Sequence, residues 1–434
     1  MSDAKPNYDA AAIEAARRTV WERRGDFEAP RTAGDRPHVY VKPSSPFTSG
    51  NLHMGHVRDY SIGDAYARFR RARGDAVLLG FGFDAFGLPA ELAAIERQIP
   101  PAEWVAQCGE RMLEQMKRLG FSFDYDRVFY SSDEGQYRWS QWLFLTLLEA
   151  GLVYRDDATV DWCDTCQTTL ASIQVEDGRC WRCHNEVRLI RRPTWFLKIT
   201  PYLEENDRNL AALEESGKWD ELSLATQRYI LGRADGRKMS KHLGNVVNPD
   251  ELVEQYGADT VRLAVLYAAG PAKTLNWSDG ALRFANRFLR GLWTYSHDRF
   301  AALGSHAHDP EAAADTEHMR DRLRKWCDNG LERVTEDTAA LQMHKSIRNL
   351  TRLFERIQDF EKRVVKRRGQ LDRADAEAQV AALVLLAQAL EPFAPHVAEQ
   401  LLIDSGRDDG PDLVGSWPEA AAIPVGVEEP APSS

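Results

Sequence analysis

The first eighty residues contain a strand, a turn-rich loop, a helix and a second strand, in that order. Residues 38–42 alternate like a strand, and residues 43–50 are rich in proline, serine and glycine. Residues 55–73 carry apolar side chains near helical spacing, and residues 76–79 form a short apolar run between two glycines. Strands that are joined through a helix run parallel. This order predicts an α/β fold that begins with a parallel sheet.

The rest of the chain changes character twice. Residues 150–193 interrupt the α/β pattern with an insert that carries four cysteines, and from about residue 249 the sequence is mainly helical. The segment 346–365 has apolar residues that recur at helical spacing, namely Ile347, Leu350, Phe354, Ile357 and Val364. This stripe predicts a helix packed within a bundle.

The composition argues against several classes of protein. The 434 residues carry a formal net charge of −11, which disfavours a protein coated in positive charge for duplex DNA. A local basic cluster, Lys362, Arg363, Lys366, Arg367 and Arg368, can meet an RNA stem or be a solvated helix end. The longest apolar stretch is far shorter than the roughly 20 residues of a membrane span, and the N-terminus has no secretory pattern. We expect no DNA partner, no membrane partner and a cytoplasmic location.

The segment His53-Met54-Gly55-His56 follows the first strand and opens the helix. A helix N-terminus presents free backbone N–H groups and a positive dipole end, which favour phosphate. Two imidazoles one turn apart can add hydrogen bonds to phosphate oxygens, and Gly55 lets a nucleotide approach the backbone. The alternative is a chance pair of histidines, but the position between strand and helix favours a phosphate site.

The segment Lys238-Met239-Ser240-Lys241 follows a glycine at residue 236. Two ammonium groups three residues apart can close over a polyphosphate, and a mobile loop can tighten in the transition state. The alternative is a solvated basic turn. Because the histidine loop and the lysine loop occur together, we interpret both as parts of one nucleotide site.

Four cysteines form two Cys-x-x-Cys pairs, Cys163 with Cys166 and Cys180 with Cys183. In a cytosolic chain such pairs suggest a metal site rather than disulfides. Four thiolates suit tetrahedral Zn²⁺, and a site closed by four sulfurs is structural. We therefore expect a zinc knuckle; the alternative is four unrelated thiols.

Together the two loops resemble the two signatures of class I aminoacyl-tRNA synthetases. The segments around them resemble the leucyl enzymes of that class, namely residues 49–60, 82–91, 194–200 and 256–263. Residues 343–347 and 392–396 are similar to the helical bundle of the same family. The resemblance covers roughly residues 36–418.

This resemblance implies a reaction. The carboxylate of an amino acid would attack the α-phosphorus of ATP, with Mg²⁺, to form an aminoacyl-adenylate and release pyrophosphate. The protein would mainly position the reactants and stabilise charge. The resemblance assigns catalytic roles on the phosphates to His53, His56, Lys238 and Lys241.

The resemblance also implies binding residues. Gly55, Met239 and Ser240 would contact ATP. Asp84 would hold the substrate ammonium, a pairing that makes electrostatic sense, and Phe47 would form a wall of the amino-acid pocket. For Asp84 the alternative is a helix N-cap.

The implied architecture is α/β, with a Rossmann-type parallel-sheet nucleotide-binding domain, a zinc-knuckle insertion and a C-terminal α-helical bundle. We expect the first half of the catalytic domain at residues 1–149, the zinc-binding insertion at 150–193 and the remainder with the lysine loop at 194–280. The bundle would occupy residues 281–418, and residues 419–434 would be a disordered tail.

The sequence departs from the leucyl pattern between Thr200 and Lys238, where it is too short for the large editing domain that leucyl enzymes usually carry. The end after Pro418 is too short for their terminal domain. We expect activation of a leucine-like aliphatic amino acid without editing, and transfer to tRNA or to a specialised small-molecule acceptor. The alternatives are a catalytically degenerate paralogue that binds RNA, an amino acid or a protein, and a nucleotidyltransferase that activates another carboxylate.

Overall fold

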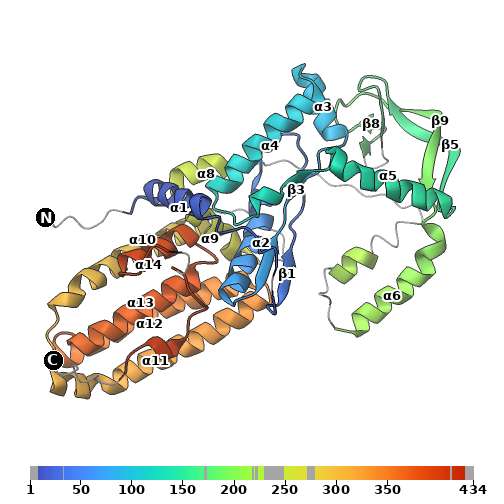
Figure 1. The fold of residues 1–434 in the computed structure, drawn as a ribbon. Helices are drawn as coiled ribbons and strands as arrows, with labels where there is room; N and C mark the ends of the chain where they lie inside the picture. The colour runs from blue at the N-terminus through green and yellow to red at the C-terminus, as the bar shows by residue number, and fades with distance from the viewer. Residues whose placement is uncertain are drawn as a thin grey trace. The chain divides into compact units, whose positions relative to one another are not determined.

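The computed structural model describes residues 8–32, 34–170, 174–217, 219, 223–228, 249–270, 279–410 and 413–425. The chain divides into two compact units. The first consists of residues 1–131 and 246–434, and the second of residues 132–245. Figure 1 shows the succession of helices and strands along the chain.

Two pairs of parallel strands lie in the first unit. β1 (His38–Val41) pairs with β2 (Ala76–Leu79), with His38 opposite Ala76, and helix α2 (Met54–Ala72) connects the two strands. β3 (Gly82–Phe83) pairs with β4 (Phe129–Tyr130). The predicted parallel strands and their connecting helix are confirmed. Within the described residues the strands form two separate pairs rather than one continuous sheet.

Helix α2 is fixed by an aromatic cluster. The ring of Tyr60, which is fully buried, meets the edges of Phe81, Phe121 and Phe123 at centroid distances of 5.7 to 5.9 Å. Such edge-to-face pairs stabilise beyond their buried area. Phe121 and Phe123 follow α4 (Pro101–Arg118). The sequence of residues 102–119 also predicts this helix. Helices α1 (Ala10–Arg24) and α3 (Leu88–Arg97) complete this part of the unit.

Buried charges join α2 to its neighbours. The carboxylate of Asp64 accepts hydrogen bonds from the Ser122 backbone N–H at 2.6 Å, from Arg68 Nε at 3.1 Å and from Arg262 Nη2 at 2.5 Å. Asp64 and Arg262 have no exposed side-chain surface. Burial alone would raise the pKa of Asp64, but the two guanidinium groups lower it to about 2. Asp64 is therefore charged, and both of its guanidinium partners are required.

Gly120 sits at a close approach between the loop after α4 and helix α14 (Pro395–Asp404). Its φ is +69°, and a Cβ at this position would overlap the imidazole of His396. His396 Nδ1 lies 2.7 Å from a carboxylate oxygen of Asp259, and both side chains are buried. Only glycine combines this backbone conformation with the available space.

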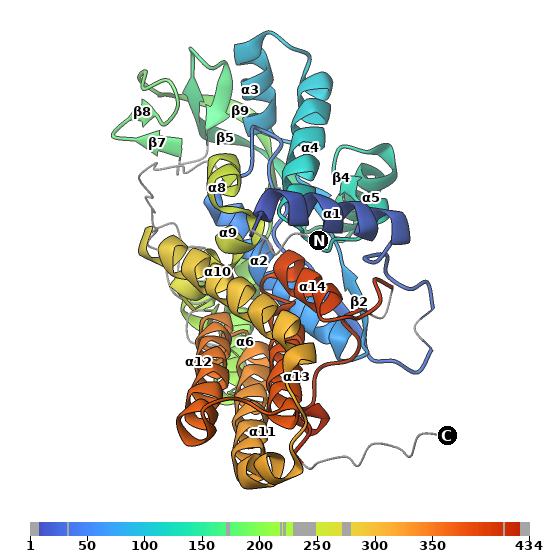
Figure 2. The same ribbon diagram turned by 90° about the vertical axis from the view of Figure 1, so that its left-hand side faces the viewer.

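The remainder of the first unit is helical. α8 (Pro249–Tyr256) and α9 (Ala258–Ala268) precede a set of long helices that pack side by side in Figures 1 and 2, namely α10 (Asp279–Ala302), α11 (Pro310–Ala339), α12 (Met343–Arg368) and α13 (Arg373–Leu390), with α14 alongside. The predicted helix at residues 346–365 lies within α12. Its five stripe residues, Ile347, Leu350, Phe354, Ile357 and Val364, are all buried, so the predicted packing face is confirmed.

The second unit contains the cysteine-bearing insert. Its longest strands, β5 (Val153–Cys163) and β9 (Arg188–Leu197), are antiparallel, and β6 (Thr168–Leu170) pairs with the other edge of β5. A small hairpin joins β7 (Val175–Glu176) to β8 (Arg179–Cys180). Helices α5 (Glu134–Glu149) and α6 (Leu203–Glu215) flank these strands in sequence. The segment Tyr229-Ile230-Leu231, whose sequence suggests a short strand, lies outside the described residues.

No helix among the described residues is both long enough and apolar enough to cross a membrane.

Candidate functional site

The two histidines of the histidine loop lie together at the start of α2. His53 is the N-cap, and its Nδ1 accepts hydrogen bonds from the backbone N–H of Gly55 at 3.1 Å and of His56 at 3.3 Å. In return, His56 Nδ1 accepts from the backbone N–H of His53 at 3.3 Å. The two rings are stacked with their centroids 3.7 Å apart. Both imidazoles therefore replace the usual capping side chains of a helix N-terminus.

This capping fixes the protonation of both rings. Because each Nδ1 accepts from a backbone N–H, the proton of a neutral imidazole must lie on Nε2. Burial lowers the pKa of His53. Burial, followed by the neighbouring His53, lowers the pKa of His56 to about 4. At neutral pH the loop thus presents two neutral Nε2–H donors.

Gly55 is required by the same arrangement. A Cβ at this position would lie 2.8 Å from Cε1 and 2.9 Å from Nδ1 of the His53 ring. An alanine would therefore push the imidazole of His53 out of its capping position. The capping position of His53 therefore requires glycine at residue 55, independently of any approach by a nucleotide.

The chain before α2 is held by side chains that the sequence analysis did not single out. The carboxylate of Asp59 accepts hydrogen bonds from the backbone N–H and the hydroxyl of Ser44. Arg111 Nη1 donates to Asn51 Oδ1 at 3.2 Å. Asp59 lies one turn after His56, but its partner is in the preceding loop, so helical periodicity gives no sign of the bond. These bonds hold the histidine loop from both sides.

Phe47, six residues after the end of β1, and Asp84, directly after β3, lie side by side. They form an isolated parallel bridge, and the Asp84 N–H donates to the Pro46 carbonyl at 3.0 Å. The ring of Phe47 is 50% exposed and the Asp84 side chain is half-buried. The alternative interpretation of Asp84 as a helix cap is not observed, because the N-cap of α3 is Gly87. An exposed aromatic face and a carboxylate are thus adjacent on the chain that follows the strands.

The lysine loop cannot be placed against these residues. Lys238, Met239, Ser240 and Lys241 lie outside the described residues, which resume at Pro249. Their roles stay predictions.

The four predicted metal ligands come together in the second unit. Cys163 is the last residue of β5 and Cys180 is the last residue of β8, and Cys166 and Cys183 lie three residues after them. Their four sulfurs lie within 4.8 Å of one another, with 3.4 Å between Cys163 and Cys183 and 4.0 Å between Cys166 and Cys180. Sulfurs about 2.3 Å from a tetrahedral zinc are about 3.8 Å apart. The cluster therefore fits a four-thiolate metal site, and among the described residues it is the one group of potential metal ligands that meet in this way.

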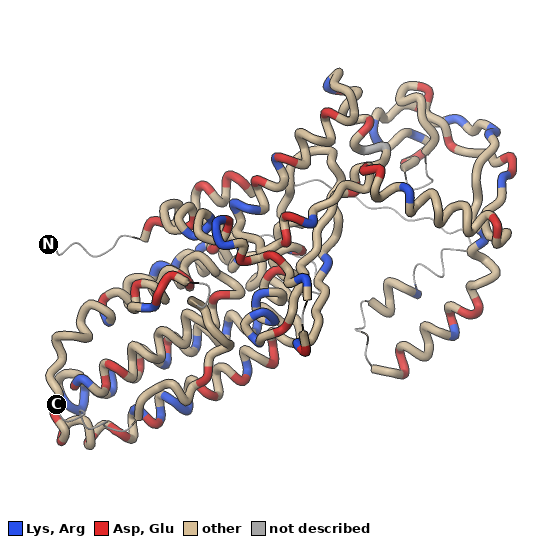
Figure 3. Tube along the Cα trace, in the orientation of Figure 1, with Lys and Arg blue, Asp and Glu red and all other residues tan. Residues whose placement is uncertain are grey.

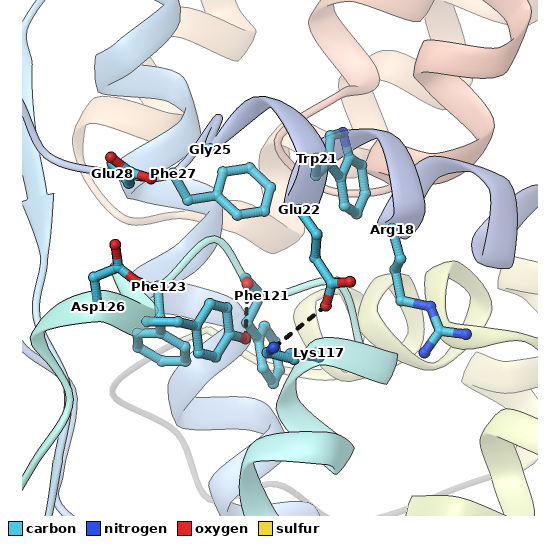
Figure 4. A pocket seen from close by; sticks show the side chains of 12 residues that line it. Arg18, Trp21, Glu22, Gly25, Phe27, Glu28, Lys117, Phe121, Phe123 and Asp126 are labelled. Atoms are coloured by element: carbon cyan, nitrogen blue, oxygen red, sulfur yellow. Dashed lines mark hydrogen bonds and ion pairs between the residues drawn. The ribbon is translucent and has the colours of Figure 1, made fainter.

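A cavity of about 340 Å³ lies elsewhere in the first unit, between α1 and the segment that follows α4. Figure 4 shows the aromatic rings of Trp21, Phe27, Phe121 and Phe123 around it, with Lys117 paired to Glu22 at its side. None of the predicted site residues lines this cavity. It is therefore separate from the histidine loop.

Models of three protein families match the chain. Residues 39–190 match "tRNA synthetases class I (M)", residues 226–278 match "tRNA synthetases class I (I, L, M and V)", and residues 323–430 match "Anticodon-binding domain of tRNA ligase".

Curated relatives share about half of the chain. It is 44% identical over 235 residues to a leucine–tRNA ligase of Pseudothermotoga lettingae, covering 54% of this chain and 28% of the relative. It is also 44% identical over 229 residues to the leucine–tRNA ligase subunit alpha of Aquifex aeolicus, covering 53% of this chain and 36% of the relative. The chain thus spans about a third of the length of these relatives.

Solved structures share the fold over almost the whole chain. The Agrobacterium radiobacter K84 agnB2 LeuRS, solved in a ternary complex with tRNA and LeuAMS, superposes with a TM-score of 0.77 and 17% identity, covering 96% of this chain and 92% of that one. A Mycobacterium tuberculosis methionyl-tRNA synthetase with methionyl-adenylate gives a TM-score of 0.64 and 17% identity, covering 84% and 93%. At this identity the likeness establishes the fold.

The protonation of the histidine loop can be measured directly. We expect the His56 imidazole to titrate with a pKa of about 4 and to carry its proton on Nε2 at pH 7. Because the unfolded chain keeps the ordinary value of about 6.5, the stability that His56 contributes is complete above pH 6.5 and is lost as pH falls through 4. Nitrogen-15 NMR of the imidazoles measures both properties, with the exposed His308 as reference. A proton on Nδ1, or a midpoint near 6.5, would contradict the capping geometry.

Proposed function

Because this chain carries class I aminoacyl-tRNA synthetase domains and is homologous to leucyl-tRNA ligases, we propose that it activates a leucine-like aliphatic amino acid with ATP. The product is an aminoacyl-adenylate, and the aminoacyl group then passes to tRNA or to a small-molecule acceptor. The catalytic unit is a Rossmann-type domain, of which the β1–β2 and β3–β4 parallel pairs are parts.

One observation carries the proposal, namely the pair of neutral imidazoles that cap α2. Two Nε2–H donors stand at the positive end of a helix of 19 residues. Such a site binds phosphate oxygens and stabilises negative charge that develops on them. His53 and His56 then bind the triphosphate of ATP, with Gly55 as the point of close approach. Lys238 and Lys241 neutralise the leaving pyrophosphate, with Met239 and Ser240 in the same loop and Mg²⁺ bound to the phosphates.

In this proposal the amino acid lies against the bridge between Phe47 and Asp84. The Asp84 carboxylate pairs with the substrate ammonium, and the exposed ring of Phe47 covers part of the side-chain pocket. The backbones of the two residues are joined by the bridge. The spacing between the Asp84 carboxylate, which would bind the ammonium, and the Phe47 ring, which would form the apolar wall, is therefore fixed.

We propose that this chain does not edit. Between β9, which ends at Leu197, and α8, which begins at Pro249, 13 residues form α6 and fewer than 40 others remain. Domains rarely have fewer than about 50 residues. The domain boundaries that we propose from the sequence lie after residues 149, 193, 280 and 418. The lysine loop falls between the second and the third of them.

For the acceptor, the bundle offers an RNA-binding face. Two adjoining grooves of about 350 and 380 Å³ run between α11 and α12 and share Trp326. Their basic lining residues are His318, Arg322, Arg333, Arg352, Arg356, Arg363, Lys366 and Arg367, and none of the residues that line either groove is acidic. We call these residues the basic groove.

This acid-free lining is unusual in a chain whose net charge is −11. Figure 3 shows that acidic residues are frequent elsewhere on the same two helices. The guanidinium carbons of Arg356 and Arg363 lie 5.1 and 5.9 Å from the ring centre of Trp326. Cations beside an aromatic ring suit phosphates and a stacked base, which favours tRNA as the acceptor. Of the basic cluster predicted from sequence, Arg363, Lys366 and Arg367 line this groove, whereas Lys362 and Arg368 do not.

Pyrophosphate exchange into ATP, measured with each standard amino acid, tests the activation step. We expect exchange with leucine or a close aliphatic analogue. Lys241→Ala should abolish it without changing the unfolding temperature, because the charge on the leaving group is no longer neutralised. Lys362→Ala, on the exposed side of α12, is the matched control and should keep full exchange. No exchange with any amino acid favours a binding module, and exchange with an unusual acid alone favours the related nucleotidyltransferase.

Metal analysis tests the four cysteines, which we propose hold a structural Zn²⁺. The purified chain should contain one zinc per molecule, and Cys180→Ser should release it and lower the unfolding temperature of the second unit, because metal binding contributes folding free energy. Cys327→Ala replaces a buried thiol outside the cluster and should keep the metal. Full zinc content in Cys180→Ser would contradict the site.

RNA binding tests the basic groove. We expect the double variant Arg356→Glu, Arg363→Glu to bind leucine tRNA at least about tenfold more weakly and to reduce the salt dependence by about two phosphate contacts. Pyrophosphate exchange should not change. Lys325→Glu reverses a charge on α11 that pairs with Asp321 outside the groove and serves as the control. Equal affinity of the double variant and the control would exclude this face, and a chain that binds no tRNA would favour a small-molecule acceptor.

A further inference from the structure

One face of helix α4 connects the histidine loop with α8. Arg111, Gln115 and Arg118 are spaced four and three residues apart, so they share this face. Arg111 donates to Asn51 just before the histidine loop, and Arg118 lies 3.9 Å from Asp250 and 3.6 Å from Glu254 of α8. Gln115 stands between them and is the residue that contacts both sides.

The amide of Gln115 makes one hydrogen bond in each direction. Its Oε1 accepts from the backbone N–H of Leu52 at 3.0 Å, and its Nε2 donates to the Asp250 carboxylate at 2.6 Å. The side chain is buried, with 5% of its surface exposed. The partners determine the orientation of the amide, since a backbone N–H needs an acceptor and a carboxylate needs a donor. No rotated form of the amide satisfies both.

One of the two partners lies beside the histidine loop, which we propose binds the triphosphate. Leu52 immediately precedes His53, the N-cap of α2, and its side chain is buried. Asp250 is in the first turn of α8, which is the first described element after Lys241 in the sequence. The two bonds of Gln115 thus connect Leu52, which precedes the histidine loop, with Asp250 of α8.

We propose that Gln115 is a positioning residue that couples the placement of the histidine loop to α8. This inference rests on the proposed function for its catalytic meaning. Gln115 does not contact the phosphates in this scheme. It fixes the backbone N–H of Leu52, and so the capping geometry of His53, only when Asp250 is in place.

The test uses a charge exchange across the amide. Gln115→Glu keeps an acceptor for Leu52 but sets a carboxylate against Asp250. Asp250→Asn keeps an acceptor for Gln115 and removes the charge. In the double variant the introduced carboxylate accepts from the backbone N–H of Leu52, as the Gln115 amide oxygen does in the native chain. It also accepts from the introduced amide, so only the bond to position 250 returns with donor and acceptor exchanged. The coupling is read as non-additivity of the three variants.

We expect Gln115→Glu to lower kcat for pyrophosphate exchange about 10- to 100-fold, the range expected for misplaced reactive groups, with a smaller change in KM for ATP. Asp250→Asn alone should have little effect, and the double variant should recover most of the lost kcat. Gln107→Glu is the matched control. It makes the same substitution on the same helix, also beside a carboxylate, because Gln107 Nε2 donates to Glu103 at 3.2 Å, and it should retain full kcat.

Hydrogen–deuterium exchange of the backbone amides separates this inference from the proposed function. In the full chain without substrate, Gln115→Glu should accelerate exchange at residues 51–57, and the double variant should restore protection. This result supports the coupling even if the unaltered chain activates no amino acid. Unchanged kcat and unchanged amide protection in Gln115→Glu would overturn the inference. So would a loss that Asp250→Asn does not rescue, since a merely structural role predicts additive losses.

Discussion

The carboxylate of Asp64 is the point at which the first unit is held together. It lies without exposed surface between Arg68 and Arg262 and also accepts from Ser122, so α2, α9 and the chain after α4 meet on one charged group. A buried charge is tolerated only when its partners remain in place. Displacement of α2 from α9 would leave an unpaired guanidinium or carboxylate in the interior. Because His53 caps α2, the position of the histidine loop depends on this buried pairing at Asp64, eleven residues after His53 on the same helix.

The histidine loop shows how one set of contacts can serve both structure and chemistry. The same Nδ1 atoms that satisfy the first backbone N–H groups of α2 force the protons onto Nε2, the outward nitrogen. Burial keeps both rings neutral near pH 7. A neutral donor forms its hydrogen bond without the release or uptake of a proton. In the proposed function, both donors are therefore in place before ATP binds.

The local features could be predicted from the sequence, and the distant ones could not. The strands, α2, α4 and the apolar stripe of α12 follow from periodicity within a few turns, and the clustering of the cysteines follows from their spacing. The roles of Phe47 and Asp84 came only from the family resemblance, and the backbone bridge between them was not predicted. Gln115 and Asp250, or Asp64 and Arg262, are more than a hundred positions apart, so no local pattern brings them together. The roles of the lysine loop remain predictions, because that segment lies outside the described residues.

Gly120 has a consequence for how this unit can change. The chain after α4 approaches His396 so closely that a single methyl group would act as a wedge between them. His396 has no room to retreat, because it is held by Asp259 and packs on Trp21 with ring centroids 4.8 Å apart. A larger residue at position 120 would push the chain after α4 away from α14. Phe121 and Phe123 lie on this chain, so their ring contacts with Tyr60 would be disrupted.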